Sequence, residues 1–473
     1  MAGGDRPAYR ALEIDDWARS QQAVVPPHCI CGRFECRMMF IWGTEMSVGA
    51  KGQMSVCQWL MIALLWLTPS ITNAQTASKA MSDPRTEEAI ALMMRFAERT
   101  GIDSDRPQQR YLWTDAFAVC NFLGLARATG QERYRQLALQ LIDQVHHTLG
   151  QHRSDDPRTG WISGLSGQEA EAHPTRGGLR IGKRLPERDQ NAPFDESLEW
   201  DRDGQYFHYL TKWMHALDQT TRSTGQPTFN VWAQELAESA HRTFTYVPPG
   251  SKRKRMYWKV SIDLSRPLVP SMGQHDPIDG YITYVQLQTT ASKMPGSTPG
   301  PSVSDEAGEF ASMIERGSFA TTDPLGLGGL LTDAARVVQL MQQGASVGDD
   351  LLQALLTTAR TGLELYVEQE DLRQSPTHRL AFRELGLAIG LHAVAFMWQA
   401  AEDRPERFPK GSTVYAQLQT LMRYAPFRTE IESFWRDPEN RQTQIWAEHR
   451  DINEVMLATT LAPEGFFVLH SPP

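Results

Sequence analysis

The stretch WAEHRDINEV, near the C-terminus, holds the densest group of residues that could do chemistry. It contains Glu448, His449, Arg450, Asp451 and Glu454. Asp451 and Glu454 are three residues apart, so they share one face if the stretch is helical. Carboxylates on such a face could act as a general acid and a general base, and the histidine could move a proton near pH 7.

A second group lies in QHDPIDG and contains His275, Asp276 and Asp279. It offers the same two kinds of group, an imidazole and paired carboxylates. A histidine and an aspartate can also bind zinc or calcium, but the chain has no pair of histidines at helical spacing around this motif. We therefore expect no metal and no cofactor.

A third stretch, EWDRDGQYFHYLTKWMHAL, places charged residues directly before a helix-like aromatic run. It supplies Trp200, Arg202, Asp203, Tyr206 and His208. Asp203 follows Asp279 and Glu454 as a candidate catalytic carboxylate. The other four residues are candidates for binding a substrate.

Each acidic residue in these openings has a simpler explanation as a helix cap. An aspartate at a helix start accepts hydrogen bonds from free backbone N–H groups and offsets the helix dipole, for about 1 kcal/mol. This applies to Asp115, Asp203, Asp276, Asp279 and Asp451 when each is considered alone. The functional hypothesis depends on several such openings meeting at one place.

Aromatic residues lie beside or between these openings. They are Trp113, Trp161, Trp200, Tyr206 and Trp446. Sugar rings bind against flat aromatic faces, whereas core packing is the better explanation for about half of the set. Trp113 and Asp115, in the opening YLWTDAF, complete the predicted binding residues, which also include His275, Asp276, His449, Arg450 and Asp451.

The elements that must position these residues are helices arranged in pairs. From Glu87 onward the apolar spacing is helical rather than alternating. The predicted pairs are 114–130 with 131–150, 203–225 with 227–244, 279–294 with 304–317, 326–344 with 348–369, 378–402 with 413–426, and 442–463 with a helix near 87–98. Few segments favour a strand, mainly 255–264 and 465–470.

The two helices of each pair differ in composition. First helices are apolar nearly all round and rich in Gly and Ala, whereas second helices carry charge on one side. A helix that is apolar all round is buried on every side, and an amphipathic helix faces water. An inner ring of first helices within an outer ring of second helices satisfies both patterns. The predicted fold is therefore all-α, an (α/α)6 toroid with long loops at its mouth.

At this point the chain resembles the six-hairpin glycosidase-like superfamily of (α/α)6 barrels, over roughly residues 85–470. The matching features are the openings of the inner helices: YLWTDAF, EWDRDGQYF, QHDPIDGYITY, TDPLGLGG, THRLAFRELG and AEHRDINEV. The superfamily includes glycoside hydrolases, unsaturated-glycan hydrolases and sugar 2-epimerases, which bind saccharides at the barrel mouth. The resemblance implies a saccharide substrate and no single subfamily.

Three functional hypotheses follow. The first is a glycoside hydrolase that uses two carboxylates, with Asp279 and Glu454 as the predicted pair and Asp203 next. The second is a sugar epimerase or isomerase that transfers protons through His275 and His449, with help from His208. The third is a toroid that binds a glycan or a protein without catalysis.

Residues 150–200 form a long connection with many glycines and prolines and no clear helix. Connections of this length inside a compact domain are usually functional or disordered. This one carries Trp161, Arg176, Arg180 and Lys183. It could therefore act as a lid with cationic contacts to an anionic sugar. A second long connection covers 246–280.

The overall charge limits the partners. The chain has 473 residues, 41% of them hydrophobic and 22% charged, which is typical of a globular protein. Its net charge of −9 gives no general attraction to nucleic acid or to anionic lipid.

The N-terminal 80 residues are set apart from the predicted barrel domain, residues 81–473. Trp59–Leu67 is an apolar run too short to span a bilayer, and it is followed by small residues that predict a signal peptide cleaved after Ala74. Secretion or export to the periplasm would follow. Translation from Met81 would instead give a cytoplasmic protein without Cys29, Cys31 and Cys36, whose spacing is not that of a standard zinc site.

Overall fold

The computed structural model describes residues 83–270, 273–294, 300–314, 319–369 and 371–472. The predicted signal peptide, the start at Met81, the boundary at residue 80 and the N-terminal cysteines lie outside these residues. Within them the chain is mainly helical, as the sequence predicts, with five very short strands.

The predicted helical pairs are present, mostly within a few residues of their expected ends. The first helices are α3 (Leu112–Thr129), α7 (Phe207–Thr224), α9 (Asp276–Ala291), α11 (Pro324–Gln342), α13 (Ala381–Asp403) and α17 (Arg450–Leu461). The second helices are α4 (Glu132–Leu149), α8 (Pro227–Phe244), α10 (Ser304–Ile314), α12 (Asp349–Glu368), α14 (Thr413–Leu421) with α15 (Ala425–Arg436), and α2 (Pro84–Arg99).

Shorter elements fill the connections. They are the helices α5 (Gly167–Ala172), α6 (Glu196–Asp201), α16 (Gln444–Glu448) and α18 (Glu464–Phe467), and the 3-10 turns η1 (Asp371–Arg373), η2 (Pro376–His378) and η3 (Met422–Tyr424). The prediction of a strand over 465–470 is wrong, because this segment begins in α18 and continues without a strand.

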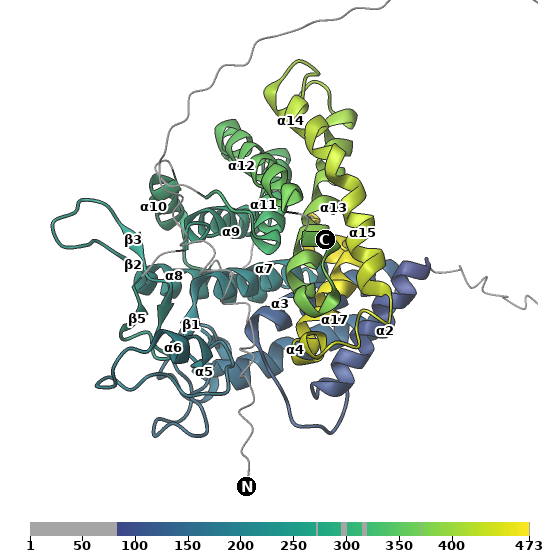
Figure 1. Cartoon of the computed structure of the whole chain (residues 1–473). Coiled ribbons are helices and arrows are strands. Elements are labelled where there is room, and N and C mark those ends of the chain that lie inside the picture. Colours follow the sequence, from purple (N-terminus) through teal and green to yellow (C-terminus); the bar gives the residue numbers. More distant parts are fainter. Residues whose placement is uncertain (1–82, 271–272, 295–299, 315–318, 370, 473) are drawn as a thin grey trace, which may run out of the picture. The chain divides into compact units, whose positions relative to one another are not determined.

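The strands form two small antiparallel sheets. One has the order β1 (Gln205–Tyr206), β4 (Lys259–Val260) and β5 (Pro267–Val269), with Gln205 opposite Val260. The other pairs β2 (Thr245–Tyr246) with β3 (Arg255–Met256). The strands and the short helices α5 and α6 gather on one side of the long helices (Figure 1). The pairing of β1 with β4 joins the second long connection, residues 246–280, to the residues that precede α7.

Burial follows the predicted difference between the two kinds of helix. Nearly every residue of α3 from Leu112 to Ala126 is buried, and α11 and α13 are also buried around most of their circumference. In α4 and α12 the buried residues form one face, at helical spacing. The core therefore lies among the first helices.

Each first helix packs against its partner in the pair and against other first helices. The partner contacts are α3 with α4, α7 with α8, α9 with α10, α11 with α12, α13 with α15 and α17 with α2. Contacts among first helices join α3 to α7, α7 to α9, α9 to α11, α11 to α13, α13 to α17 and α17 to α3.

Helix α13 is the one described helix that is long and apolar enough to cross a membrane by length and composition. Most of it is buried against other helices of the protein, which is typical of a core helix. The described chain therefore gives no indication of an integral membrane protein.

Helices α11 and α13 approach each other through glycines. A Cβ atom on Gly328 would lie 2.0 Å from the carbonyl oxygen of Gly386, and one on Gly390 would lie 2.7 Å from the Cα atom of Gly328. Neither position leaves room for a side chain, because the obstructing atoms belong to the backbone.

We expect Gly328→Ala to lower the free energy of unfolding by about 3 kcal/mol, the upper range for overpacking of a core, as measured by urea denaturation. Gly308→Ala is the matched control, since Gly308 is exposed on α10 and a Cβ there would meet nothing within 4 Å. That change should instead stabilise the protein by up to about 1 kcal/mol. Equal effects of the two changes would contradict the close packing of α11 and α13.

Candidate functional site

A pocket of about 450 Å³ opens where α3 and α17 begin and α2 ends. It brings together three of the predicted site residues, His449, Arg450 and Asp451. The remaining lining residues are Arg99, Tyr111, Thr114, Arg184, Ala447, Glu448 and Ile452. The pocket therefore joins the C-terminal constellation to the opening of α3.

Arg99, at the end of α2, organises the carboxylates beside this pocket. Its Nε donates to Asp451 Oδ1 at 2.6 Å, and its Nη2 donates to Glu454 Oε2 at 2.8 Å. The prediction that Asp451 and Glu454 share a helix face is confirmed by this common partner. The charge of Arg99 is thus already balanced within the protein.

Two other guanidinium groups at the pocket are not balanced in this way. Arg184 and Arg450 are exposed, and no ion pair involves either of them among the described residues. Within the described part of the chain, Glu448 is the only lining carboxylate besides Asp451. The pocket consequently presents cationic groups that are available to a negatively charged ligand.

His449 occupies a break in the helical structure of the last opening. The sequence predicts one helix over 442–463, but α16 ends at Glu448 and α17 begins at Arg450. The Nδ1 atom of His449 lies 3.0 Å from the carbonyl oxygen of Ile445, which can only accept a hydrogen bond. This contact assigns the proton of neutral His449 to Nδ1 and leaves Nε2 as the basic nitrogen.

A buried ionic network lies at the start of α9. Lys212 Nζ donates to Asp279 Oδ2 at 2.7 Å, and Arg336 Nη1 lies 3.4 Å from Asp279 Oδ1. Burial alone would raise the pKa of Asp279, but the charges of Lys212 and Arg336 outweigh it and hold that pKa well below its usual value. Asp279 is therefore ionised, and it links α7, α9 and α11.

The same network orients His275. Its Nε2 lies 2.7 Å from Asp333 Oδ2, and Asp333 Oδ1 accepts from Arg336 Nη1 at 2.9 Å. A carboxylate that holds one nitrogen of an imidazole fixes both its orientation and its tautomer. Sequence analysis did not select Asp333 and Arg336, although two charged residues one turn apart inside an apolar helix were a visible signal.

Asp276 has the opposite environment to Asp279, although it lies one helical turn away. It is 0% exposed, and no side chain among the described residues hydrogen-bonds to either of its carboxylate oxygens. Burial raises the pKa of Asp276 well above its usual value, and the negative charge of Asp279 adds to this. Asp276 therefore holds its proton to a higher pH than Asp279 does.

His208 lies close to this acid, with 3.8 Å between its Nδ1 and Asp276 Oδ1. The Nε1 atom of Trp258 donates to the same Nδ1 at 3.2 Å, which requires Nδ1 to be unprotonated. Burial, with a smaller effect from Lys212, lowers the pKa of His208 to about 3. His208 is thus a neutral buried histidine at neutral pH.

The predicted aromatic residues form a packed cluster rather than an open wall. Trp200 packs on Trp258 at 4.3 Å between ring centroids, and Tyr206 stacks on Trp258 at 5.3 Å. Trp113 lies under Lys212, whose Nζ is 5.9 Å from the ring centroid. Trp113, Trp200 and Tyr206, three of the five predicted aromatic residues, are buried. The aromatic residue at the pocket is Tyr111, which sequence analysis missed because it precedes the helix.

Asp203, a predicted catalytic carboxylate, is held inside an arginine clamp. It is 0% exposed and accepts from Arg180 Nη1 at 2.9 Å, Arg153 Nη1 at 3.3 Å and the Gly182 backbone N–H at 3.0 Å. Its neighbour Arg202 uses its carbonyl oxygen to accept from Lys259 Nζ at 2.7 Å. The contacts of Asp203 fasten the long connection to the residues before α7.

Asp115 behaves mainly as a helix cap. Its Oδ2 accepts from the Tyr111 backbone N–H at 2.9 Å, and its Oδ1 lies 3.4 Å from Arg110 Nη1. Burial raises the pKa of Asp115 to about 6, despite the opposing charge of Arg110. Its side chain is buried and does not line the pocket, whereas that of its neighbour Thr114 does.

The predicted pair Asp279 and Glu454 has separate partners. The contacts of Asp279 run to α7 and α11, whereas Glu454 pairs with Arg99 of α2. Among the described residues no hydrogen bond or ion pair joins the two carboxylates, and the carboxylate nearest to Asp279 along its own helix is Asp276.

The long connection 150–200 is anchored by the cations that sequence analysis assigned to a ligand. Arg176 pairs with Glu235 at 3.1 Å, Arg180 holds Asp203, and Lys183 Nζ donates to the Trp200 carbonyl oxygen. The basic residue of this connection that faces the pocket is Arg184 instead. The sequence did not distinguish Arg184 from Arg176, Arg180 and Lys183, because the partners that hold those three residues come from distant segments.

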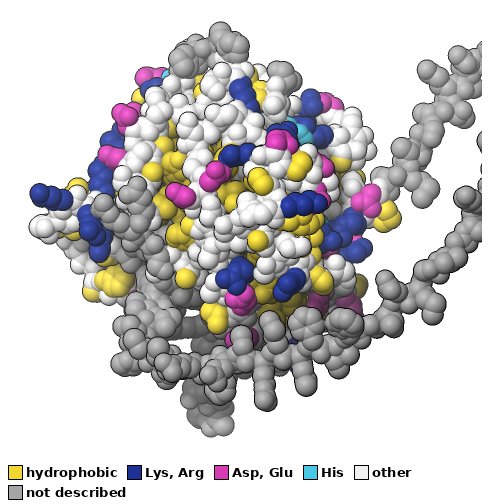
Figure 2. Space-filling view, turned by 90° about the horizontal axis from the view of Figure 1, so that it is seen from above, with side chains coloured by type: hydrophobic (Ala, Val, Ile, Leu, Met, Phe, Trp, Pro, Cys, Tyr) yellow, Lys and Arg dark blue, Asp and Glu magenta, His cyan; other side chains and the backbone are white. Residues whose placement is uncertain are grey.

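The electrostatic surface and metal-binding capacity complete the description. Figure 2 shows cationic and anionic side chains interspersed with apolar ones on the face in view, without an extended area of one sign. Within the described ranges no group of three or more His, Cys, Asp or Glu residues could hold a metal ion.

No protein-family model and no curated protein matches the sequence.

Proposed function

We propose that the chain is an (α/α)6 toroid. The support is the order of helix contacts, in which α3, α7, α9, α11, α13 and α17 each pack on the next and α17 packs on α3. Each of these helices also packs on its own outer partner. Such an arrangement would bring the six openings to one end of the domain, which is where the superfamily that the sequence resembles binds saccharides.

We propose further that this end is the active site of a carbohydrate-active enzyme, a glycosidase-type hydrolase. The observation that carries this proposal is the pair Asp276 and Asp279, one turn apart at the start of α9, in which burial raises the pKa of Asp276 while Lys212 and Arg336 lower the pKa of Asp279. Two carboxyl groups with pKa values pushed apart by their environments are what acid and base roles require. In this proposal Asp276 is the general acid, and it takes the place of Glu454 as the partner of Asp279.

A second candidate, a sugar epimerase or isomerase, is favoured by a different observation. His275 is held by Asp333, and His449 is held by the Ile445 carbonyl oxygen, so both imidazoles are oriented. Oriented imidazoles suit proton abstraction from a carbon beside a carbonyl group.

One experiment separates these candidates. The purified protein is incubated with panels of neutral and acidic oligosaccharides and with free sugars, and both new reducing ends and epimers are measured. A hydrolase yields reducing ends that Asp276→Asn abolishes. An isomerase yields epimers that His275→Gln and His449→Gln abolish. Saturable binding of a glycan without either product would support the non-catalytic toroid and contradict both enzymatic proposals.

The pocket further favours an acidic saccharide. We expect Arg184→Gln and Arg450→Gln each to weaken binding of acidic oligosaccharides by about tenfold, because each removes a charge-assisted hydrogen bond worth about 1.5 kcal/mol or more. Isothermal titration at low and high salt measures the effect, which salt should reduce. Arg242→Gln is the control, since Arg242 is exposed on α8 without a described ion pair. Unchanged affinity in both pocket variants would contradict an acidic substrate.

For localisation we retain both predicted starts as proposals, export through the signal at Trp59–Leu67 or a cytoplasmic protein from Met81. Mass spectrometry of the native N-terminus separates them, since cleavage after Ala74 leaves Gln75 as the first residue.

A further inference from the structure

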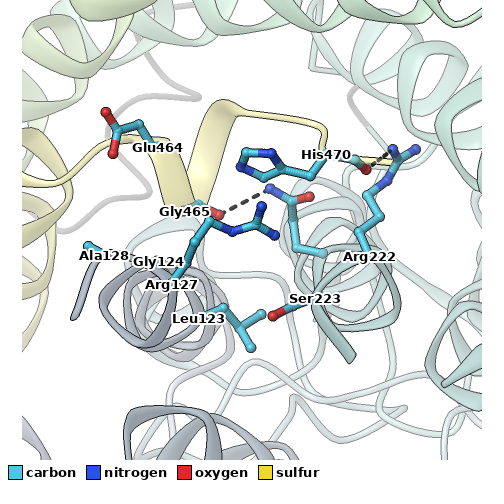
Figure 3. A pocket seen from close by; sticks show the side chains of 10 residues that line it. Leu123, Gly124, Arg127, Ala128, Arg222, Ser223, Glu464, Gly465 and His470 are labelled. Atoms are coloured by element: carbon cyan, nitrogen blue, oxygen red, sulfur yellow. Dashed lines mark hydrogen bonds between the residues drawn. The ribbon is translucent and has the colours of Figure 1, made fainter. Parts of the chain in front are cut away.

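A small cavity lies where α3 and α7 end, at the opposite end of these helices from the candidate active site. Its volume is about 70 Å³, and it is closed by the C-terminal segment 464–470 (Figure 3). This space is enough for a few water molecules or one small ion. The proposed function makes no use of it.

The C-terminal segment is fixed in place by side chains from the helix ends. Gln219 Nε2 donates to the Gly465 and Val468 carbonyl oxygens, both at 3.0 Å. Arg222 Nη1 donates to the His470 carbonyl oxygen at 2.9 Å. The position of His470 beside the cavity is therefore defined by hydrogen bonds.

Arg222 supplies a buried donor without a described partner. It is 2% exposed, and its Nε donates to Asp218 Oδ2 at 2.6 Å. Its Nη2 is buried and makes no hydrogen bond within the described part of the chain. A buried guanidinium N–H without an acceptor is costly, and a bound anion would satisfy it.

Arg127 adds a second cation at the same cavity. It is exposed, and no ion pair involves it among residues 83–472 that are described. Figure 3 shows its guanidinium group and the His470 imidazole directed into the same space between the helix ends. Burial, with the charges of Arg127 and Arg222, lowers the pKa of His470.

The lining holds little negative charge to balance these groups. Among the described lining residues Glu464 is the only acidic one, and its carboxylate is directed away from the Arg127 guanidinium (Figure 3). Asp218 is engaged by Arg222, by Asn230 Nδ2 at 2.8 Å and by Gln286 Nε2 at 2.6 Å. The Asp218 carboxylate offsets the charge of Arg222, so the cavity offers the charge of Arg127 and an excess of hydrogen-bond donors.

We propose that this cavity binds a single small oxyanion of the phosphate class, between Arg127, Arg222 and His470. The anion joins the ends of α3 and α7 to the C-terminal segment and holds that segment in place. Inorganic phosphate and the phosphate group of a small metabolite present the same oxygens to these donors. The proposal is independent of the reaction at the other end of the helices.

The test is a titration of the full chain with inorganic phosphate, with chloride at equal ionic strength as the reference. Phosphate should bind saturably by isothermal titration and slow hydrogen exchange of the backbone amides of residues 465–470. It should also raise the pKa of His470, followed by the imidazole C–H resonance in NMR, because an anion stabilises the imidazolium. His470→Gln assigns that resonance.

Arg127→Gln should weaken phosphate binding about tenfold or more, the loss expected for one charge-assisted hydrogen bond. Arg242→Gln should leave binding unchanged. It is matched because Arg242, like Arg127, is an exposed arginine in the last turn of a helix. Arg222 is left intact, since its contacts hold the C-terminal segment.

Absence of saturable phosphate binding would overturn the proposal, as would equal losses in the two arginine variants. A parallel titration with a sugar phosphate identifies the source of the anion. Tighter binding of the sugar phosphate that Arg127→Gln removes indicates a metabolite, and equal affinity indicates the free anion.

Discussion

Asp276→Asn is expected to abolish catalysis while making the folded protein more stable at neutral pH. The change is nearly isosteric and removes the ionisable group of a residue that is fully buried and accepts no hydrogen bond from a described side chain. Loss of a general acid typically lowers the rate by about 10²–10⁴-fold. Asparagine is neutral without binding a proton, so the change removes the cost of protonating Asp276 on folding. It should raise the free energy of unfolding by about 1.4 kcal/mol for each unit by which the fold raises that pKa, up to the pH of the measurement.

The raised pKa of Asp276 also predicts the direction in which the stability difference between Asp276→Asn and the wild type changes with pH. The folded-state pKa of Asp276 is raised well above that of the unfolded chain, about 3.9. Its contribution to stability is therefore complete below pH 4 and is lost as the pH rises from there through the folded pKa. The stability gained by Asp276→Asn over the wild type should grow with pH over the same range, as measured by urea denaturation.

Asp279→Asn is the matched comparison from the same helical turn. Asp279 is ionised and paired with Lys212 and Arg336, so neutralising it leaves two cations without their partner. It should lower the free energy of unfolding by about 3–5 kcal/mol. If Asp276→Asn destabilised the protein as much as Asp279→Asn, or retained full activity, the assignment of Asp276 as a neutral acid would be wrong.

Asp203→Asn is expected to destabilise the protein by about 3–5 kcal/mol without removing the chemistry. The variant loses the negative charge that Arg180 and Arg153 share, and breaking a buried ion pair leaves uncompensated charge. Urea denaturation measures the loss. Activity per folded molecule, measured well below the transition, should stay within a few-fold of the wild type.

The control is Asp201→Asn, two residues earlier and exposed, with no hydrogen bond or ion pair among the described residues. It should change stability by less than about 0.5 kcal/mol. A stable Asp203→Asn variant that has lost turnover would instead identify Asp203 as a catalytic carboxylate.

The local pattern of apolar and polar residues was sufficient to predict the helices. The first helices are apolar nearly all round because they are buried on every side, and this requirement is visible in the sequence without knowledge of their neighbours. Gly308 and Gly328 show that this pattern does not predict which helical glycines are closely packed. Both are glycines inside helices, but one is exposed and the other lies against the backbone of α13. Only the packing of distant helices distinguishes them.

The sequence by itself determined which openings carry acidic, histidine and aromatic residues, and it located the pocket residues His449, Arg450 and Asp451. It could not determine the state of any carboxylate. Asp276 and Asp279 are the same residue type in one motif, yet the pKa of Asp276 is raised and the pKa of Asp279 is lowered. The difference arises because Lys212 of α7 and Arg336 of α11 reach Asp279, whereas no described side chain hydrogen-bonds to Asp276. Charges brought together from different helices decide ionisation, and only the tertiary structure sets those distances.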